Sequence, residues 1–244
     1  MLRPSVQGWL PLVVLSLAPA GLLPLAVPPG QAAETATVQE ILDGNQLYID
    51  QKQAKVNDRA NSPELVSTKN SRGQLLFSRG AAGRLNRFSL LRLGSSCFLM
   101  EKGQILVSGK QNGCTRSARM SVRGTNYVID VQDDGTTELS VLEGSVEVES
   151  LEEGEPTGGP ITTVVAGQRL QLSAAGVVLA LLDLTSGDYS RILEGELFSG
   201  FSTELPGFAQ LESYIRLNVP GVSLPSVIRV PSVPSVPSIP GFGF

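Results

Sequence analysis

The stretch that decides the fold is residues 121–148, which read SVRGTNYVIDVQDDGTTELSVLEGSVEV. Tyr127, Ile129 and Val131 fall on one face of its first apolar run, and the valines of its last run alternate with glutamates. A period of two is the signature of a strand with one buried face. Asp-Asp-Gly and Glu-Gly steps separate the runs and supply turn residues. The stretch therefore predicts three short strands joined by tight turns.

Similar apolar runs extend on both sides of this stretch, from Thr37 to Leu182. They lie at residues 47–49, 75–77, 88–93, 98–100 and 105–107, with glycines between them. Many short strands with glycine turns are typical of an all-β sandwich, barrel or solenoid. A weak echo between residues 100–109 and 132–144 repeats the order strand, turn, strand, glycine, as stacked rungs would. The sequence predicts a mainly β domain over residues 34–182, either a β-roll like a β-helix or a jelly-roll.

The N-terminus has the pattern of an export signal. Arg3 precedes an apolar stretch at residues 9–27, and the first acidic residue is Glu34. Small residues at 30–33 suit a signal peptidase, so residues 1–33 are expected to form a cleaved signal peptide. Several prolines interrupt the apolar stretch, which argues against a retained membrane span. We expect a periplasmic or secreted protein, with membrane anchoring as the alternative if the leader is retained.

The composition argues against catalysis. The chain has no histidine, 19 Lys and Arg against 23 Asp and Glu, and a net charge of −4. Without imidazole, a Ser-His-Asp triad cannot form and zinc loses a common ligand. No Gly-x-x-x-x-Gly-Lys-Ser/Thr phosphate loop occurs, and an acidic chain lacks the concentrated basic face that nucleic acid requires. We expect no enzyme, no metal, no cofactor and no nucleic-acid partner.

Two charged clusters stand out against this background. The acidic one, at residues 143–155, has the oxygen ligands that calcium uses, but alternation places Glu147 and Glu149 on an exposed strand face. We interpret it as a solvated loop. The basic one comprises Arg116, Arg119 and Arg123, with Lys102 and Lys110 upstream. We interpret these residues as solvated strand ends and loops.

Cys97 and Cys114 are the only cysteines. In an exported protein, two cysteines at this separation most simply form one structural disulfide. A redox pair is the alternative, but the spacing is unlike Cys-x-x-Cys.

Residues 183–218 change to helical spacing. Thr185 or Ser186 can cap a first helix, and a second short helix is expected after Pro206. Apolar stripes follow at Tyr189, Ile192, Leu193 and Leu197 and at Phe208, Leu211 and Ile215. We predict a short helical extension that docks on the β domain, with a partner-binding element as the alternative.

Residues 219–244 are rich in proline and repeat Val-Pro-Ser with a period of three. That period matches polyproline II, which needs no internal hydrogen bonds. We expect a disordered, extended tail with an apolar end, Gly-Phe-Gly-Phe. It is either a passive spacer or a docking segment for an envelope partner.

The central stretch resembles the FecR domain family. Residues 121–148 follow that family's R-G-T-x-F-x-V and D-G-T-T-x-V-x-V-L-E-G-x-V-x-V patterns, and a glycine-glutamine step follows at 165–170. Weaker matches at 71–77 and 83–86 extend the similarity over about residues 38–174. The motif positions, which we interpret as structural, are Arg123, Gly124, Thr125, Tyr127, Gly135, Glu143, Gly144, Gly167 and Gln168.

The resemblance implies a periplasmic, twisted β-roll that works in sensing or protein contact. The best-known FecR regulators carry a cytoplasmic anti-sigma segment and one transmembrane helix before this domain. Here the leader starts at Met1, so we expect a stand-alone exported FecR domain without a cytoplasmic sigma-factor partner. The motif glycines are expected to allow positive φ or tight packing at rung corners. Tyr127 stands where the pattern prefers phenylalanine, so its hydroxyl needs water or a partner.

Together these patterns predict a non-catalytic binding or scaffolding module of the cell envelope, with sensing as one role. Its partner is expected to be an envelope protein or a cell-wall glycan. A cell-wall or polysaccharide-binding protein is the alternative function. A hydrolase is less favoured, because nothing marks two carboxylates as set apart in a cleft and aromatic residues make up only 5% of the chain.

Overall fold

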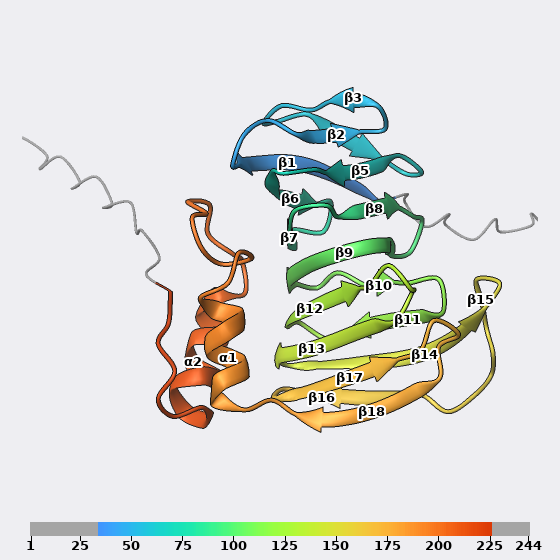
Figure 1. The fold of residues 1–244 in the computed structure, drawn as a ribbon, viewed down its shortest axis with the longest axis vertical. Coiled ribbons are helices and arrows are strands. Elements are labelled where there is room, and N and C mark those ends of the chain that lie inside the picture. The colour runs from blue at the N-terminus through green and yellow to red at the C-terminus, as the bar shows by residue number, and fades with distance from the viewer. Residues whose placement is uncertain (1–33, 226–244) are drawn as a thin grey trace, which may run out of the picture. The chain divides into compact units, whose positions relative to one another are not determined.

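The computed structural model describes residues 34–225, in which 18 strands are followed by two helices (Figure 1). The strands form two layers, here named sheet A and sheet B, and strand β9 belongs to both. A mainly β fold with short C-terminal helices is confirmed, while the choice between roll and jelly-roll stays a prediction. The predicted signal peptide and residues 226–244 of the predicted tail lie outside the described residues.

Sheet A is antiparallel throughout its described pairings, and its strands follow one another almost in chain order. From one end to the other they are β4 (Arg59–Asn61), β1 (Thr35–Leu42), β6 (Arg72–Phe77), β7 (Ala82–Leu85), β9 (Phe98–Gly109), β12 (Thr125–Val131), β13 (Thr137–Glu143), β17 (Gln168–Leu172) and β18 (Val178–Asp183).

The strands of sheet B also follow one another almost in chain order. One of their pairs, between β9 and β10, is parallel. Its strands are β3 (Lys52–Gln53), β2 (Leu47–Ile49), β5 (Leu65–Thr68), β8 (Leu90–Leu93), β9, β10 (Gly113–Cys114), β11 (Ala118–Val122), β14 (Ser145–Glu152) and β16 (Thr162–Val165). The short β15 (Glu155–Pro156) pairs with the end of β14.

One apolar core lies between the two sheets. Ile129 on β12 stands opposite Ile105 on β9 and Leu139 on β13, and all three are buried in this core. Phe77 from sheet A stacks on Phe98 from the sheet B end of β9, with ring centroids 5.5 Å apart. The alternation along the decisive stretch therefore does what a period of two predicts, because every second side chain enters the shared core.

Strand β9 connects the two layers. The sequence predicts two strands here, separated by a turn at Gly103, whereas the structure has one bent strand of 12 residues. Residues 98–102 pair in sheet B and residues 103–109 pair in sheet A. Gly103 has φ +83°, and a Cβ there would lie 2.8 Å from the Cα of Ser89. Glycine therefore lets the strand change layers without losing its pairing.

The two helices, α1 (Ser186–Leu193) and α2 (Phe208–Asn218), cover part of the outer face of sheet A (Figure 1). Thr185 caps α1 as predicted, in a reciprocal capping box with Asp188. Leu197, expected on the helical stripe, lies beyond the end of α1 but packs in the same cluster. This second apolar cluster comprises Ala82, Leu106, Val128 and Leu142 from sheet A and Tyr189, Leu193, Leu197, Phe198, Leu205, Phe208, Leu211 and Ile215 from the helical segment.

The start of the predicted proline-rich tail differs from the expectation of disorder. Val219, Val222 and Leu224 are partly buried against the helical cluster, because their apolar side chains extend the covered surface. None of the helices in residues 34–225 is long and apolar enough to cross a membrane.

Candidate functional site

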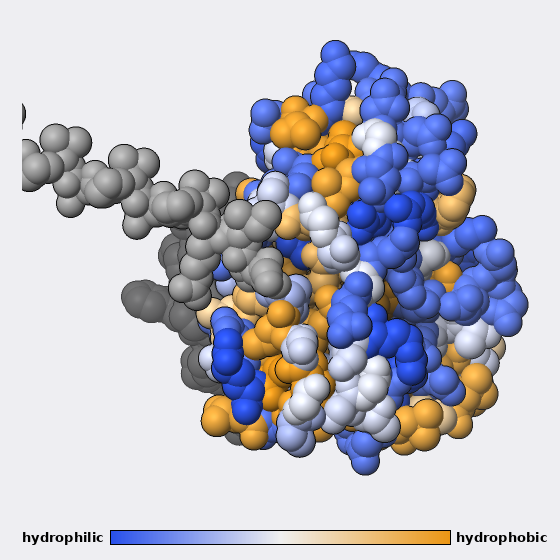
Figure 2. All heavy atoms as spheres, turned by 60° about the vertical axis from the view of Figure 1, so that its left-hand side comes forward, coloured by the Kyte–Doolittle hydropathy of each residue, from blue (hydrophilic) through white to orange (hydrophobic). Residues whose placement is uncertain are grey.

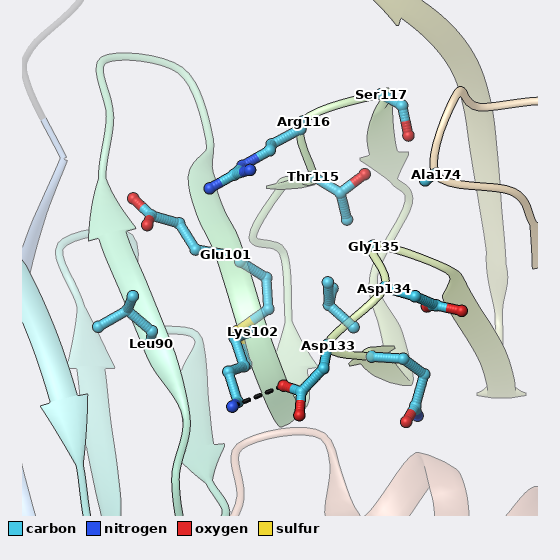
Figure 3. Close-up of a pocket in the computed structure, with 13 residues that line it drawn as sticks. Leu90, Glu101, Lys102, Thr115, Arg116, Ser117, Asp133, Asp134, Gly135 and Ala174 are labelled. Atoms are coloured by element: carbon cyan, nitrogen blue, oxygen red, sulfur yellow. Dashed lines mark ion pairs between the residues drawn. The ribbon is translucent and has the colours of Figure 1, made fainter.

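A cleft of about 380 Å³ opens where loops of both sheets meet (Figure 3). Its walls come from β8 and β9, from the loop between β10 and β11, from the turn between β12 and β13, and from the turn after β17. The lining residues are Leu90, Met100, Glu101, Lys102, Thr115, Arg116, Ser117, Val131, Gln132, Asp133, Asp134, Gly135 and Ala174.

The turn between β12 and β13 forms one wall, and its sequence explains its shape. Gly135 has φ +85°, and a Cβ there would lie 3.1 Å from the Cβ of Ala174. The Asp134 carboxylate accepts a hydrogen bond from the Thr136 backbone N–H at 2.9 Å. That hydrogen bond lowers the pKa of Asp134, so the carboxylate remains charged well into the acid range. The turn therefore presents a fixed negative charge at the rim of the cleft.

The disulfide predicted from the cysteine count is present and shapes the opposite wall. Cys97 and Cys114 are bonded, which ties the start of β9 to β10. The next residue, Thr115, donates its backbone N–H to the Ala118 carbonyl at 2.8 Å. Residues 115–117 are consequently held between a covalent link and a strand.

Thr115 and Arg116 have side chains without a hydrogen-bond or ion-pair partner among the described residues. Thr115 is 3% exposed, and its Oγ1 has no hydrogen-bond partner. A buried hydroxyl without a partner costs about 1–3 kcal/mol, so it calls for an explanation. Arg116 is exposed, and Figure 3 shows its side chain reaching toward Glu101 with no ion pair between them. Within residues 34–225 this guanidinium has no ion-pair partner.

Three other charges of the lining are paired, whereas Asp134 has no ion-pair partner among the described residues. Lys102 Nζ lies 2.5 Å from Asp133 Oδ1, and Glu101 Oε1 lies 3.0 Å from Arg92 Nε. Arg116 is thus the cation that remains available to an incoming anion. Leu90, Met100 and Val131 supply an apolar floor. The arrangement suits binding of an anionic group next to an apolar one.

No activated nucleophile is evident in this lining. Ser117 is the hydroxyl beside Thr115 and is 6% exposed. Serine needs an adjacent base to act as a nucleophile, and the chain contains no imidazole.

The other three motif glycines lie away from the cleft, at turns where the chain passes between the sheets. Gly124 (φ +63°) joins β11 to β12, Gly144 (φ +84°) joins β13 to β14, and Gly167 (φ +85°) joins β16 to β17. At Gly144 a Cβ would lie 2.5 Å from Thr125 Cγ2, so only glycine fits without a shift. Of the nine motif positions, Gly135 alone lines the cleft.

The remaining motif side chains make local contacts. Arg123 is exposed and pairs with Glu147 at 3.1 Å. Glu143 accepts from Asn126 Nδ2 at 3.0 Å, and Gln168 accepts from the Val165 backbone N–H at 3.2 Å.

Tyr127 is wholly buried, and its hydroxyl donates to the Gln111 carbonyl at 2.6 Å. Burial raises the pKa of this phenol, which keeps it neutral. Thr125, also buried, has an Oγ1 without a partner. The hydroxyl that distinguishes Tyr127 from the preferred phenylalanine therefore has the partner it needs.

The structure separates four members of the basic cluster into two groups, and the fifth, Lys110, is exposed and outside the cleft. Arg119 and Arg123 pair with Glu149 and Glu147 on the outer face of sheet B, at 3.7 Å and 3.1 Å. Lys102 and Arg116 instead line the same cleft. Thr115 gave no sequence signal except its position directly after a disulfide cysteine.

Known structures and one protein family are similar to parts of the chain. No curated protein sequence matches the chain. Two crystal structures described as a "putative anti-sigma factor" from Parabacteroides distasonis ATCC 8503 are similar to part of it. The first is 17% identical with a TM-score of 0.43, over 54% of this chain and 65% of that one. The second is 16% identical with a TM-score of 0.42, over 53% and 64%. The chain thus spans less than two thirds of either structure's length.

A protein-family model described as FecR protein matches residues 64–147, from the residue before β5 into β14. The matched region is narrower than the similarity predicted over residues 38–174, and it includes every residue that lines the cleft except Ala174. The chain therefore contains a FecR domain, which this match places at residues 64–147.

Proposed function

We propose that the chain is a non-catalytic, sensory binding module of the cell envelope, and that the cleft beside Thr115 and Arg116 binds its ligand. The family match supports a sensory or regulatory role in the envelope. The disulfide supports an oxidising compartment, because such bonds persist in exported proteins and are rare in the cytosol.

The observation that carries the binding proposal is the unpaired guanidinium of Arg116 in the cleft lining. The buried Thr115 hydroxyl lacks a hydrogen-bond partner, and the adjacent Arg116 guanidinium lacks an ion-pair partner among the described residues. A carboxylate supplies what the guanidinium needs, since it accepts charge-assisted hydrogen bonds from the fork of an arginine. The ligand is accordingly a carboxylate-bearing group of an envelope protein, with an apolar portion against the cleft floor.

A neutral glycan fits the cleft less well. Sugar rings are commonly recognised by stacking on aromatic side chains, and none of the cleft-lining residues is aromatic. A cell-wall fragment that carries carboxylates shares the proposed chemistry and is a necessary comparison in the test.

The test measures ligand binding with a panel of defined probes. It contains short dicarboxylates, capped glutamate-containing peptides, muropeptides and neutral chito-oligosaccharides, and binding is followed by calorimetry and by amide shifts of residues 115–117. Arg116→Ala is expected to weaken binding of the carboxylate probes at least about tenfold, the effect of losing one charge-assisted contact. Arg123→Ala serves as the matched control, since Arg123 is an exposed arginine whose partner, Glu147, lies outside the cleft.

Three outcomes would contradict the proposal. The first is equal binding of neutral and carboxylate probes. The second is binding that Arg116→Ala leaves unchanged or that Arg123→Ala weakens to the same extent. The third is turnover of any probe, which would contradict the non-catalytic part.

A further inference from the structure

The two ends of the strand stack differ in polarity. At one end, β3 and β4 present Lys52, Gln53 and Arg59 to solvent. At the other end lie β16 and β18, the last strands of the two sheets (Figure 1). Seven of the ten exposed large apolar side chains of the described residues lie on these two strands or directly beside them: Ile161, Val165, Val177, Val178, Leu179, Leu181 and Leu182.

Figure 2 shows the same contrast on the molecular surface. Hydrophilic side chains form the tip of the upper end, and hydrophobic side chains gather along parts of the lower end. Stacked β architectures need a polar terminal layer to remain soluble, because each layer otherwise exposes the apolar side chains that would contact the next one. The β3–β4 end has such a layer, and the β16–β18 end lacks it.

Strand β18 is also an open edge. In the described residues it pairs with β17 alone, so the backbone N–H and C=O groups along its second edge have no strand partner. No charged residue occurs from Val177 to Leu182, and Asp183 stands at the end of the strand. Natural sheets protect such edges with charges, prolines or bulges. Strand β18 has one irregularity against β17, between Val178 and Ala180, which leaves residues 180–182 as a regular apolar edge without charge or proline.

We propose that β18 is the interface for a second copy of this chain, which adds its own β18 antiparallel and joins the two A sheets. The apolar ends then meet in the middle and the polar β3–β4 ends face outward. The same surface serves both copies, so the contact closes as a dimer and does not propagate. The cleft at Arg116 is not needed for this contact.

Charge selects the direction of the pairing. In an antiparallel pair, the two Asp183 carboxylates lie at opposite ends of the new ladder, whereas parallel pairing in register would set them side by side. Like charges directly opposite each other in a sheet are destabilising. The chain's own residues 226–244 are a poorer occupant, because a proline recurs at every third residue from Pro231 to Pro240 and proline has no N–H for a ladder.

The first experiment measures the oligomeric state of the full-length chain by sedimentation velocity across a wide concentration range. We expect a reversible monomer–dimer equilibrium. Leu179→Lys, which changes a side chain that is 59% exposed on β18, is expected to raise the dimer dissociation constant at least about tenfold. Val56→Lys is the matched control, because Val56 is 48% exposed and lies before β4 at the polar end.

Three results would overturn the proposal. The chain stays monomeric at every concentration, it forms assemblies that grow beyond a dimer, or Leu179→Lys leaves the dimer unchanged.

The second experiment tests the pairing itself and does not depend on one variant folding. Single cysteines are placed in turn at residues 178–182, while the native cysteines stay in their own disulfide. In an antiparallel two-fold pair only the position at the centre of symmetry faces itself, so cross-linked dimers are expected at one position or two neighbouring ones. Equal cross-linking at all five positions would indicate parallel pairing, and a dimer without any cross-link would exclude β18. Either result overturns the proposal.

Discussion

Glu40 on β1 holds the segment after α1 against sheet A. Its carboxylate accepts the backbone N–H groups of Ser202 and Thr203, each at 2.9 Å. Burial acts to raise the pKa of Glu40, but the hydrogen bonds from Ser202 and Thr203 hold it below its ordinary value of 4.5. Arg84 lies nearby, buried, with its guanidinium 4.3 Å from the centre of the Phe201 ring and a hydrogen bond to the Thr203 carbonyl. One carboxylate and one guanidinium thus bind the same short segment.

Acid is expected to release this segment. Because the pKa of Glu40 is lower in the folded chain than in the unfolded one, its contribution to stability is complete above pH 4.5 and is lost as the pH falls through the folded pKa. The side chain is partly exposed, so solvent screens the effect. The amide shifts of Ser202 and Thr203, followed by NMR, should titrate with a midpoint below 4.5.

Glu40→Gln is the control for this titration. It keeps a side-chain acceptor but removes the ionisation, so the amide shifts of Ser202 and Thr203 should become flat across the acid range. It should also lower the free energy of unfolding near neutral pH by roughly 1 kcal/mol. A wild-type midpoint at or above the ordinary value would contradict the role assigned to these hydrogen bonds.

Single residues also mark how far the candidate site could be predicted. The turn at residues 133–135 and the cysteine pair were evident from composition and spacing, and both shape the cleft. In the sequence, Arg116 was only one member of a basic cluster. In the structure, Arg119 and Arg123 pair with carboxylates across β11 and β14, whereas Arg116 does not. The unpartnered Thr115 hydroxyl depends on three-dimensional burial, for which no local pattern exists.

Among the elements, the β10 segment depends most on the disulfide. The bond joins residues 17 apart, and a closed loop of about that size stabilises a fold by about 3 kcal/mol on the chain-entropy account. We expect Cys97→Ala with Cys114→Ala to lower the free energy of unfolding by that amount in urea titrations. The same double variant should weaken carboxylate binding, because residues 115–117 lose their anchor.

Wild-type protein reduced under native conditions provides the comparison for the double variant. Its unfolding midpoint should move toward that of the variant, while the oxidised wild type stays higher. Equal midpoints for oxidised and reduced protein would show that strand pairing of β10 with β9 and β11 is sufficient by itself.

At the level of elements, strands were predictable where glycine turns and alternation agree, as in β12 and β13. The bend in β9 was not, because Gly103 is equally suited to a turn and to a change of layer. The cap of α1 was predictable because Thr185 and Asp188 form a local motif. The end of α1 was not, since Leu197 continues the apolar spacing but packs from the following turns.

For the whole molecule, the least predictable feature is that the middle strands of sheet A are covered on both faces. Tyr127 and Ile129 enter the core between the sheets, while Val128 between them packs under the helices. The sequence holds a signal for this, because Leu106 and Val128 interrupt the alternation with apolar residues on the second face. Continuous apolar runs are typical of strands buried on both sides. The helical segment is therefore a third layer of the fold.

Removing one anchor of that layer should destabilise the whole chain. Leu211 on α2 is fully buried against sheet A, so Leu211→Ala leaves a cavity and is expected to lower the free energy of unfolding by about 2–5 kcal/mol. Leu217 lies on the same helix but is 84% exposed, and Leu217→Ala should change that free energy by less than about 0.5 kcal/mol.

Urea unfolding of both variants, followed by tyrosine fluorescence and far-ultraviolet circular dichroism, provides the measurement. If the helical segment is integral to the fold, both signals shift together in Leu211→Ala. An early helical transition that leaves the β signal unchanged would instead make it an independent appendage.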